Sequence, residues 1–195
     1  MTKFKALSMA AALLLSPMTT AVYAADSYAI DEQHAWIQFA ISHAGWSNAR
    51  GQFRAISGGI VFDHDDVTNS SVNVVIQAES IDTNLEARDE HIRSPDLLNV
   101  EEFPTIEFTS TSIEQTGDRT ALITGDMTLV GTTKSVVLDV VWGAEFPLPW
   151  DAATIKTGFS ATTSINGVDF GINKLVDFGL GPNIDIVMDI EAVKQ

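Results

Sequence analysis

The sequence predicts an all-β protein of antiparallel strands, either a sandwich or a closed barrel, with a short helical insertion around residues 85–98. Three observations support this. Short segments alternate apolar and polar residues with the period of two that strands require. Turn-forming residues such as Gly, Pro, Asn and Asp separate these segments. The strand patterns do not alternate with helical patterns, as they would in a parallel sheet.

The alternation is clearest in four segments, which are residues 37–43, 72–79, 106–109 and 184–191. In the first of them, Ile37, Phe39, Ile41 and His43 share one face. Further strands are predicted at residues 58–63, 119–130, 136–142 and 156–165. The apolar face of each strand is expected to point into the protein.

The helical insertion is rich in charge and in helix formers, and Pro95 ends its pattern. Arg88 and His91 are three residues apart and therefore face the same side of a helix, as do Asp89 and Arg93 at four apart. Two interpretations remain open. The segment is a lid or rim whose cations meet a polar head group, or it is a solvated helix with local ion pairs worth about 0.3–0.5 kcal/mol each.

The first 24 residues have the pattern of a secretory signal peptide. Lys3 and Lys5 precede an apolar run at residues 6–15, and Val22-Tyr23-Ala24 places small residues at the positions that a signal peptidase reads. Cleavage is expected after Ala24, which leaves residues 25–195 as one domain in the periplasm. The chain has no cysteine, so disulfides and a lipid anchor on a cysteine thiol are excluded.

Charge and motif content exclude several classes of function. Residues 25–195 carry 9 basic and 26 acidic residues, a formal charge of −17 that repels nucleic acid and anionic membranes. The sequence contains no nucleophile elbow, glycine-rich phosphate loop or zinc-protease motif. His64 lies in an acidic turn that lacks the spacing of a calcium loop, so we expect no metal site and no cofactor.

Several ordered segments resemble the YceI-like family. They are Ile37-Gln38-Phe39-Ala40-Ile41-Ser42-His43, Arg88-Asp89-Glu90-His91-Ile92-Arg93-Ser94, Phe103-Pro104-Thr105-Ile106-Glu107-Phe108, Gly125-Asp126-Met127-Thr128-Leu129 and Asp169-Phe170-Gly171-Ile172. The resemblance covers essentially all of residues 25–195. It implies a lipocalin-like, eight-stranded antiparallel barrel that holds a polyisoprenoid or another long amphiphile in an internal tunnel, and a possible homodimer. The sequence departs from the family at Gly167, where an arginine is common, and this weakens the case for a pyrophosphate head group.

The leading hypothesis is a non-enzymatic carrier of a polyisoprenoid, quinone-like or fatty chain. The alternatives are an envelope enzyme acting on a lipid-linked substrate, with His43 as its candidate acid or base, and a stress-response interaction module with a filled core. The predicted ligand-binding residues are Ile37, Phe39, Ile41, His43, Phe53, Ile60, Phe62, Val74, Ile76, Arg88, His91, Ile106, Phe108, Met127, Leu129, Phe159, Ile184, Ile186 and Met188.

Overall fold

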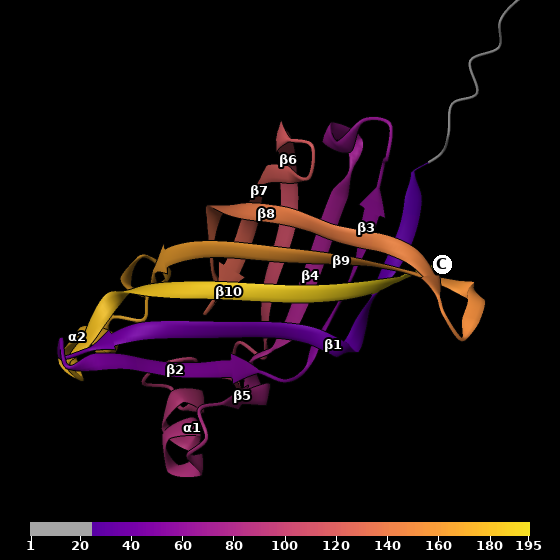
Figure 1. Ribbon diagram of the computed structural model, residues 1–195. Coiled ribbons are helices and arrows are strands. Elements are labelled where there is room, and N and C mark those ends of the chain that lie inside the picture. The colour runs from indigo at the N-terminus through magenta and orange to yellow at the C-terminus, as the bar shows by residue number, and fades with distance from the viewer. Residues whose placement is uncertain (1–24) are drawn as a thin grey trace, which may run out of the picture.

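The computed structural model describes residues 25–195, so the predicted signal peptide lies outside the described residues. Ten strands form one antiparallel sheet (Figure 1). They are β1 (Asp26–His43), β2 (Ser47–Phe53), β3 (Ile56–Phe62), β4 (Ser71–Gln77), β5 (Ile81–Asp82), β6 (Thr105–Gly117), β7 (Thr120–Leu129), β8 (Thr132–Leu148), β9 (Asp151–Asn166) and β10 (Leu180–Lys194). The short helices are α1 (Glu86–Arg93), α2 (Lys174–Asp177) and three 3-10 turns at Val67–Asn69, Ala78–Ser80 and Gly167–Phe170.

Eight of these strands close into a barrel. The order is β10-β9-β8-β7-β6-β4-β3-β1, and β1 pairs back to β10. In Figure 1, β8, β9, β10 and β1 run side by side, and β7, β6, β4 and β3 cross behind them. The predicted eight-stranded antiparallel barrel is therefore confirmed, and so is the helical insertion, which contains α1.

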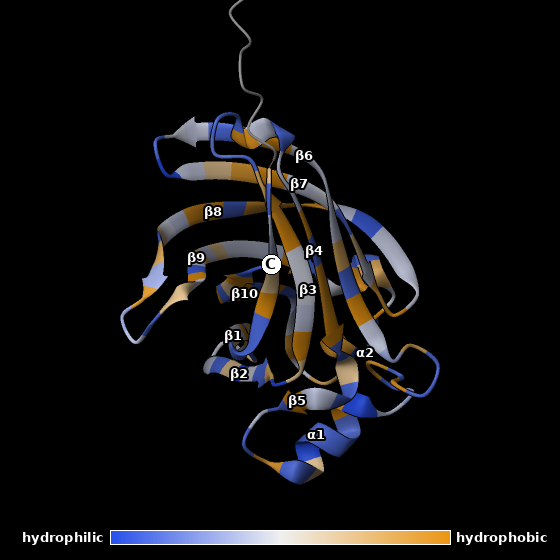
Figure 2. Ribbon diagram, turned by 90° about the vertical axis from the view of Figure 1, so that its right-hand side faces the viewer, coloured by the Kyte–Doolittle hydropathy of each residue, from blue (hydrophilic) through white to orange (hydrophobic). Residues whose placement is uncertain are grey.

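The long strand β1 has different neighbours along its length. Its first residues, 26–29, pair with β3, and its last residues, 37–43, pair with β2. The small strand β5 then extends the sheet beyond β2. At this end β2 takes the place of β3 beside β1, and α1 packs next to β5. Figure 2 shows α1 as a mostly hydrophilic helix lying at this end of the barrel.

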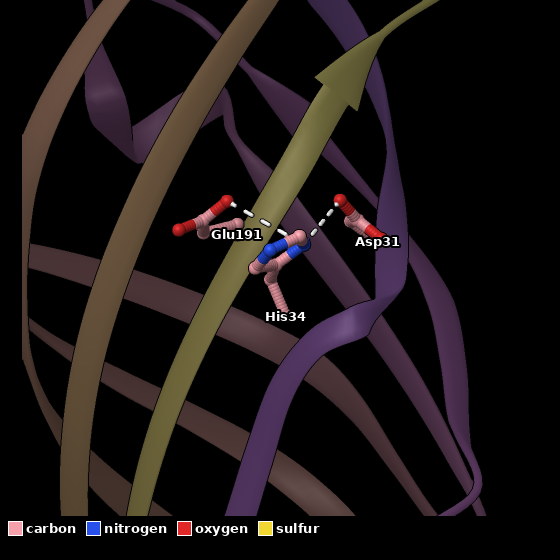
Figure 3. Close-up of side chains that lie close together, drawn as sticks. All are labelled: Asp31, His34 and Glu191. Atoms are coloured by element: carbon pink, nitrogen blue, oxygen red, sulfur yellow. Dashed lines mark hydrogen bonds and ion pairs between the residues drawn. The ribbon is translucent and has the colours of Figure 1, made fainter.

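A bulge divides the two parts of β1. The register against β10 shifts between Ile30 and Ala35, which releases residues 31–34 from the ladder. Figure 3 shows the result on the outer surface, where His34 lies between Asp31 and Glu191. Nδ1 of His34 is 2.9 Å from Oδ2 of Asp31 and 4.0 Å from Oε2 of Glu191. The bulge therefore directs polar side chains outward and leaves the lumen face of β1 apolar.

The core consists of a large cluster of aliphatic and aromatic side chains contributed by strands all around the barrel, and a smaller cluster around Tyr28, Phe62 and Ala192. Ile37, Ile56, Phe108, Leu138 and Ile165 are among the buried members of the large cluster. Buried and exposed residues alternate along β8: Val136, Leu138 and Val140 point into the core, while their neighbours are exposed. The period-two pattern of the sequence thus decides which side chains enter the lumen.

Candidate functional site

The lumen contains a cavity of about 350 Å³ at the end of the barrel that carries α1 and α2. Side chains from β1, β2, β6, β7 and β10 form its wall, and α1 and α2 border it. Sixteen of the predicted ligand-binding residues line it: Ile37, Phe39, Ile41, His43, Phe53, Val74, Ile76, Arg88, His91, Ile106, Phe108, Met127, Leu129, Ile184, Ile186 and Met188. Most of the residues that the sequence places on apolar strand faces therefore meet around one space.

A second, smaller cavity of about 120 Å³ lies toward the other end of the barrel. The three remaining predicted residues, Ile60, Phe62 and Phe159, line this cavity and not the larger one. The ring of Phe62 packs edge-on against Phe159 and Trp142. Alternation along a strand indicates which face points inward, but it does not indicate how far along the barrel axis a residue lies.

Two glycines allow phenylalanine rings to lie flat against the cavity wall. Gly51 on β2 is the direct partner of Phe39 on β1, and a Cβ at residue 51 would lie 2.4 Å from Cζ of that ring. On the other side of the cavity, a Cβ at Gly125 would lie 2.3 Å from Cζ of Phe108. In both places the ring fills the space that a side chain on the next strand would occupy. Any larger residue at either position would push a phenylalanine into the cavity.

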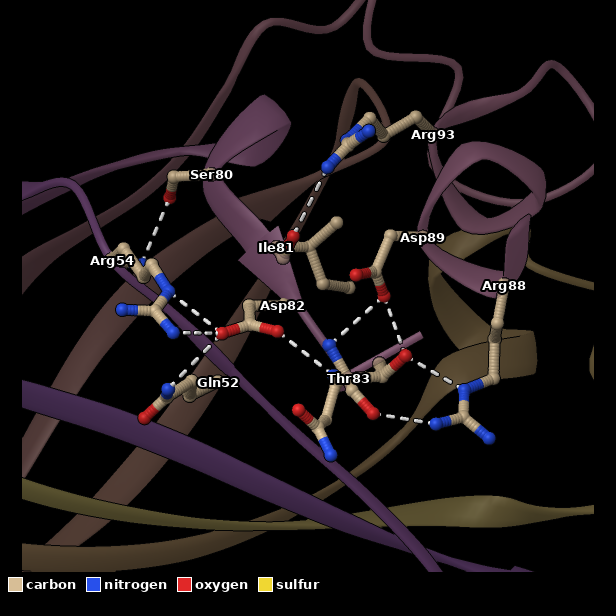
Figure 4. A network of polar contacts seen from close by, with 10 residues as sticks. Gln52, Arg54, Ser80, Ile81, Asp82, Thr83, Arg88, Asp89 and Arg93 are labelled. Atoms are coloured by element: carbon tan, nitrogen blue, oxygen red, sulfur yellow. Dashed lines mark hydrogen bonds and ion pairs between the residues drawn. The ribbon is translucent and has the colours of Figure 1, made fainter. Parts of the chain in front are cut away.

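Polar side chains border the larger cavity where it approaches α1. Arg88 donates from Nε to Oγ1 of Thr83 at 2.7 Å and from Nη2 to the Thr83 carbonyl (Figure 4). Asp89, which is buried, accepts hydrogen bonds from the backbone N–H of Thr83 at 2.9 Å and from its hydroxyl. This network fixes the guanidinium of Arg88 at the edge of the cavity.

Two histidines complete this polar border. The ring of His91 packs edge-on against Phe178, with 4.8 Å between ring centroids, and its Nε2 lies 3.7 Å from Asp96. His43 packs edge-on against Trp46, which is 81% exposed. His43, Arg88 and His91 all line the larger cavity. Through Arg88 and His91 the insertion forms part of the rim of the cavity. It also carries local ion pairs, such as the pair of Arg93 with Glu86.

Local sequence gives little indication of four other lining residues, whereas two more could have been identified. Ala49 and Arg50 belong to β2, a strand of small and polar residues without a clear apolar face. Leu175 and Phe178 come from α2 and its end, a segment too short for helical periodicity. Leu138 and Ile165 lie within predicted strands, and their alternating positions could have identified them.

Gly167, where the family commonly has arginine, is buried beside the larger cavity. A Cβ at this position would lie 2.5 Å from Cδ1 of Leu175 and 3.1 Å from Cδ1 of Ile184. Leucine and isoleucine side chains therefore fill the space next to this glycine. An arginine could enter only if this apolar wall were rearranged.

The cluster of Asp31, His34 and Glu191 on the outer surface has the residue types of a metal site, but it already contains a cation. Nζ of Lys156 is 2.6 Å from Oδ2 of Asp31 and 2.8 Å from Oε2 of Glu191. The hydrogen bond from Lys156 lowers the pKa of Asp31 to about 2, while the two carboxylates raise the pKa of the lysine. The cluster acts as an ion-pair network that joins the β1 bulge to β9 and β10.

These features define the class of protein: a lipocalin-like β-barrel with an apolar internal cavity and a polar rim at one end. The chain belongs to the family described by the YceI-like domain, whose model matches residues 28–192. Within residues 25–195, the structure has no helix with the length and apolar content needed to span a membrane.

Similar proteins cover nearly the full chain. A UPF0312 protein of Ectopseudomonas mendocina (strain ymp) is 40% identical over 193 residues, covering 96% of this chain and 98% of its own. A UPF0312 protein of Pseudomonas putida (strain W619) is 36% identical over 199 residues, covering 98% and 97%.

Solved structures share the fold. The YceI protein of Campylobacter jejuni superimposes with a TM-score of 0.69 at 26% identity, covering 76% of this chain and 86% of its own. A polyisoprenoid binding domain from Saccharophagus degradans superimposes with a TM-score of 0.63 at 14% identity, covering 86% and 98%. At that identity the second likeness concerns the fold alone.

Proposed function

We propose that this chain is a periplasmic carrier that sequesters a long apolar amphiphile, such as a polyisoprenoid, a quinone-like molecule or a fatty chain, inside its barrel. The observation that carries the proposal is the cavity of about 350 Å³ with aliphatic and aromatic walls and a polar border at one end. A long apolar chain with one polar end matches this distribution. The described polyisoprenoid binding of the Saccharophagus degradans domain supports the same class of ligand. The signal-peptide pattern of residues 1–24 supports export to the periplasm.

The energetics favour a long chain. Each buried methylene contributes about 0.8 kcal/mol, so ten carbons contribute roughly 8 kcal/mol before costs are counted. Association costs about 4–15 kcal/mol, which cancels half or more of that gain. The cargo must therefore bury considerably more than ten carbons to bind well. Binding of this kind needs no covalent step and no cofactor.

The open cavities favour the carrier over an interaction module with a filled core, because side chains would otherwise occupy this space. An enzyme acting on a lipid-linked substrate would need a positioned acid or base, and His43 on the rim is the candidate. His43→Gln keeps a polar, hydrogen-bonding side chain on the rim but removes the acid or base, so measuring lipid uptake together with turnover of a lipid-linked substrate separates the two functions. A loss of substrate turnover in that variant would favour the enzyme.

The direct test is native mass spectrometry of protein purified from its own periplasm, followed by organic extraction of any bound molecule. A stoichiometric long-chain adduct is expected, and the same spectrum would report whether the protein is a homodimer. A ligand-free mass, together with no uptake of offered quinones, isoprenoids or fatty acids, would refute the proposal.

Charge variants provide a matched test of the lumen. Phe39 points into the larger cavity, and the neighbouring Gln38 points outward. Phe39→Asp should abolish uptake because an unpaired carboxylate in the wall opposes burial of an apolar chain, whereas Gln38→Asp should not. Ile186→Asp and the exposed Val187→Asp form a second such pair, which serves if Phe39→Asp does not fold. Uptake retained in a folded lumen variant would contradict the proposal.

A further inference from the structure

The interior of the barrel is divided into two cavities that meet at a shared wall. Three residues line both the larger and the smaller cavity: Val74, Leu138 and Met188. All three are lumen-facing, and they belong to the same apolar cluster. The division is thus made by side chains, and the strands themselves continue past it.

The three residues come from different sides of the barrel. Val74 belongs to β4, Leu138 to β8 and Met188 to β10. Around the closed sheet, β10 and β8 are two strand positions apart, β8 and β4 are three apart, and β4 and β10 are three apart. This nearly even spacing lets three side chains form a constriction across the lumen. We call Val74, Leu138 and Met188 the partition.

Met188 is the adaptable member of the partition. Valine is β-branched, so the backbone restricts its χ1 rotamer, and Leu138 is buried with 7% of its surface exposed. Methionine is unbranched, has three rotatable side-chain bonds and fills irregular spaces. Met188 pairs with Ile37 on β1 and Ala161 on β9, and the small alanine leaves room on one flank. A change of its rotamer would join the two cavities without moving a strand.

We infer that Met188, with Val74 and Leu138, sets the upper length of the apolar chain that the barrel holds. This inference rests on the proposed carrier function and adds a chain-length limit to it. Chains that fit the larger cavity bind with the partition closed. Longer chains must displace the thioether of Met188 to reach the smaller cavity, and this displacement reduces their affinity.

The test compares two methionines in the same lumen. Met188 belongs to the partition, whereas Met127 on β7 lines only the larger cavity. Met188→Ala and Met127→Ala remove the same atoms, but only the first opens the partition. Binding is measured by displacement of an apolar dye with saturated fatty acids from lauric to lignoceric acid and with the prenols farnesol and solanesol.

In wild-type protein the affinity should rise with chain length up to the chains that fill the larger cavity and fall for longer ones. Met188→Ala should raise the affinity for the longest chains relative to the shortest by about tenfold or more, equivalent to at least ~1.4 kcal/mol. Met127→Ala should leave this ratio unchanged. If Met188→Ala does not fold, Val74→Ala opens the same partition from the opposite side and should shift the ratio in the same direction.

Two outcomes overturn the inference in distinguishable ways. If wild-type and partition variants bind short and long chains with the same ratio, the partition does not limit chain length, and the carrier function stands. If no chain or dye binds to any folded variant, the proposed carrier function itself fails and the inference fails with it.

Discussion

Replacing Asp89 with alanine should destabilise the protein strongly, because this carboxylate organises the segment that leads into α1. Asp89 is only 4% exposed. Its Oδ1 accepts hydrogen bonds from both the backbone N–H and the hydroxyl of Thr83, and Thr83 in turn accepts two from Arg88. Leu85, at the N-cap of α1, provides no side-chain cap. The start of the helix therefore depends on contacts made by Asp89.

The magnitude follows from the bonds that are lost. Hydrogen bonds to a charged group contribute about 1.5–3 kcal/mol each, and a buried donor left without a partner costs about 1–3 kcal/mol. The Thr83 hydroxyl can rotate toward another acceptor, but its backbone N–H cannot. We expect Asp89→Ala to lower the free energy of unfolding by about 4 kcal/mol. Asp89→Asn keeps an acceptor oxygen without the charge and should cost about 1–2 kcal/mol.

Urea denaturation followed by circular dichroism measures both variants. Glu90→Ala is the matched control, since the neighbouring carboxylate is exposed and its removal should change stability by less than about 0.5 kcal/mol. The reasoning is wrong if Asp89→Ala costs less than about 1 kcal/mol, or if asparagine is as damaging as alanine. Dye uptake by Asp89→Asn then tests whether the fixed position of Arg88 matters for binding.

Three further predictions concern other parts of the fold. Lys156 holds the pKa of Asp31 at about 2, so its stabilisation is present above the ordinary value of 3.8 and is lost as pH falls through about 2. After allowance for solvent screening, wild-type stability should fall about 1 kcal/mol more than that of Asp31→Asn over this range, and parallel urea-denaturation profiles would contradict this. Gly167→Ala should lower the free energy of unfolding by about 1–3 kcal/mol because the added methyl group crowds Leu175. Leu175→Ala in the same chain should relieve part of that cost. Additive effects of the two substitutions in a double-mutant cycle would rule out the contact. Burial and the hydrogen bond to Glu145 raise the pKa of Tyr28, which is the only tyrosine in residues 25–195. A spectrophotometric titration of a protein made of residues 25–195 should therefore lack the usual tyrosine transition near pH 10. A transition at the ordinary pH would count against the hydrogen bond between Tyr28 and Glu145.

Much of the barrel could be predicted because most of its strands carry their own pattern. The alternating faces of residues 37–43 and 184–191 belong to β1 and β10, and the charged segment around residues 85–98 contains α1. The strand β2 shows the limit of this reasoning. Its inward position Gly51 has no side chain, and Phe39 from β1 lies over it, so the apolar surface at this point comes from the neighbouring strand. A pattern search along one strand does not detect a side chain supplied by another.

The candidate site was predictable as a set of lumen-facing residues, but its division was not. Period two indicates that Phe62, Val74 and Met188 point inward. Their heights along the barrel depend on the register of each strand against its neighbours, such as the pairing of Met188 with Ile37. Sequence alone therefore could not separate the residues of the two cavities or identify the partition between them.

The closing pair of strands has a consequence for how the protein folds. β1 and β10 pair residues from opposite ends of the sequence, such as Tyr28 with Lys194, and Gln195 donates its backbone N–H to the carbonyl of Ser27. Contacts of such high contact order form late and slowly, because a long loop must close before they stabilise the chain. Until β10 arrives, β1 and β9 each present an unpaired edge that can join another chain. The barrel is thus most vulnerable to aggregation just before its last strand docks, and variants that weaken β10 should reduce the yield of folded protein more than their effect on final stability suggests.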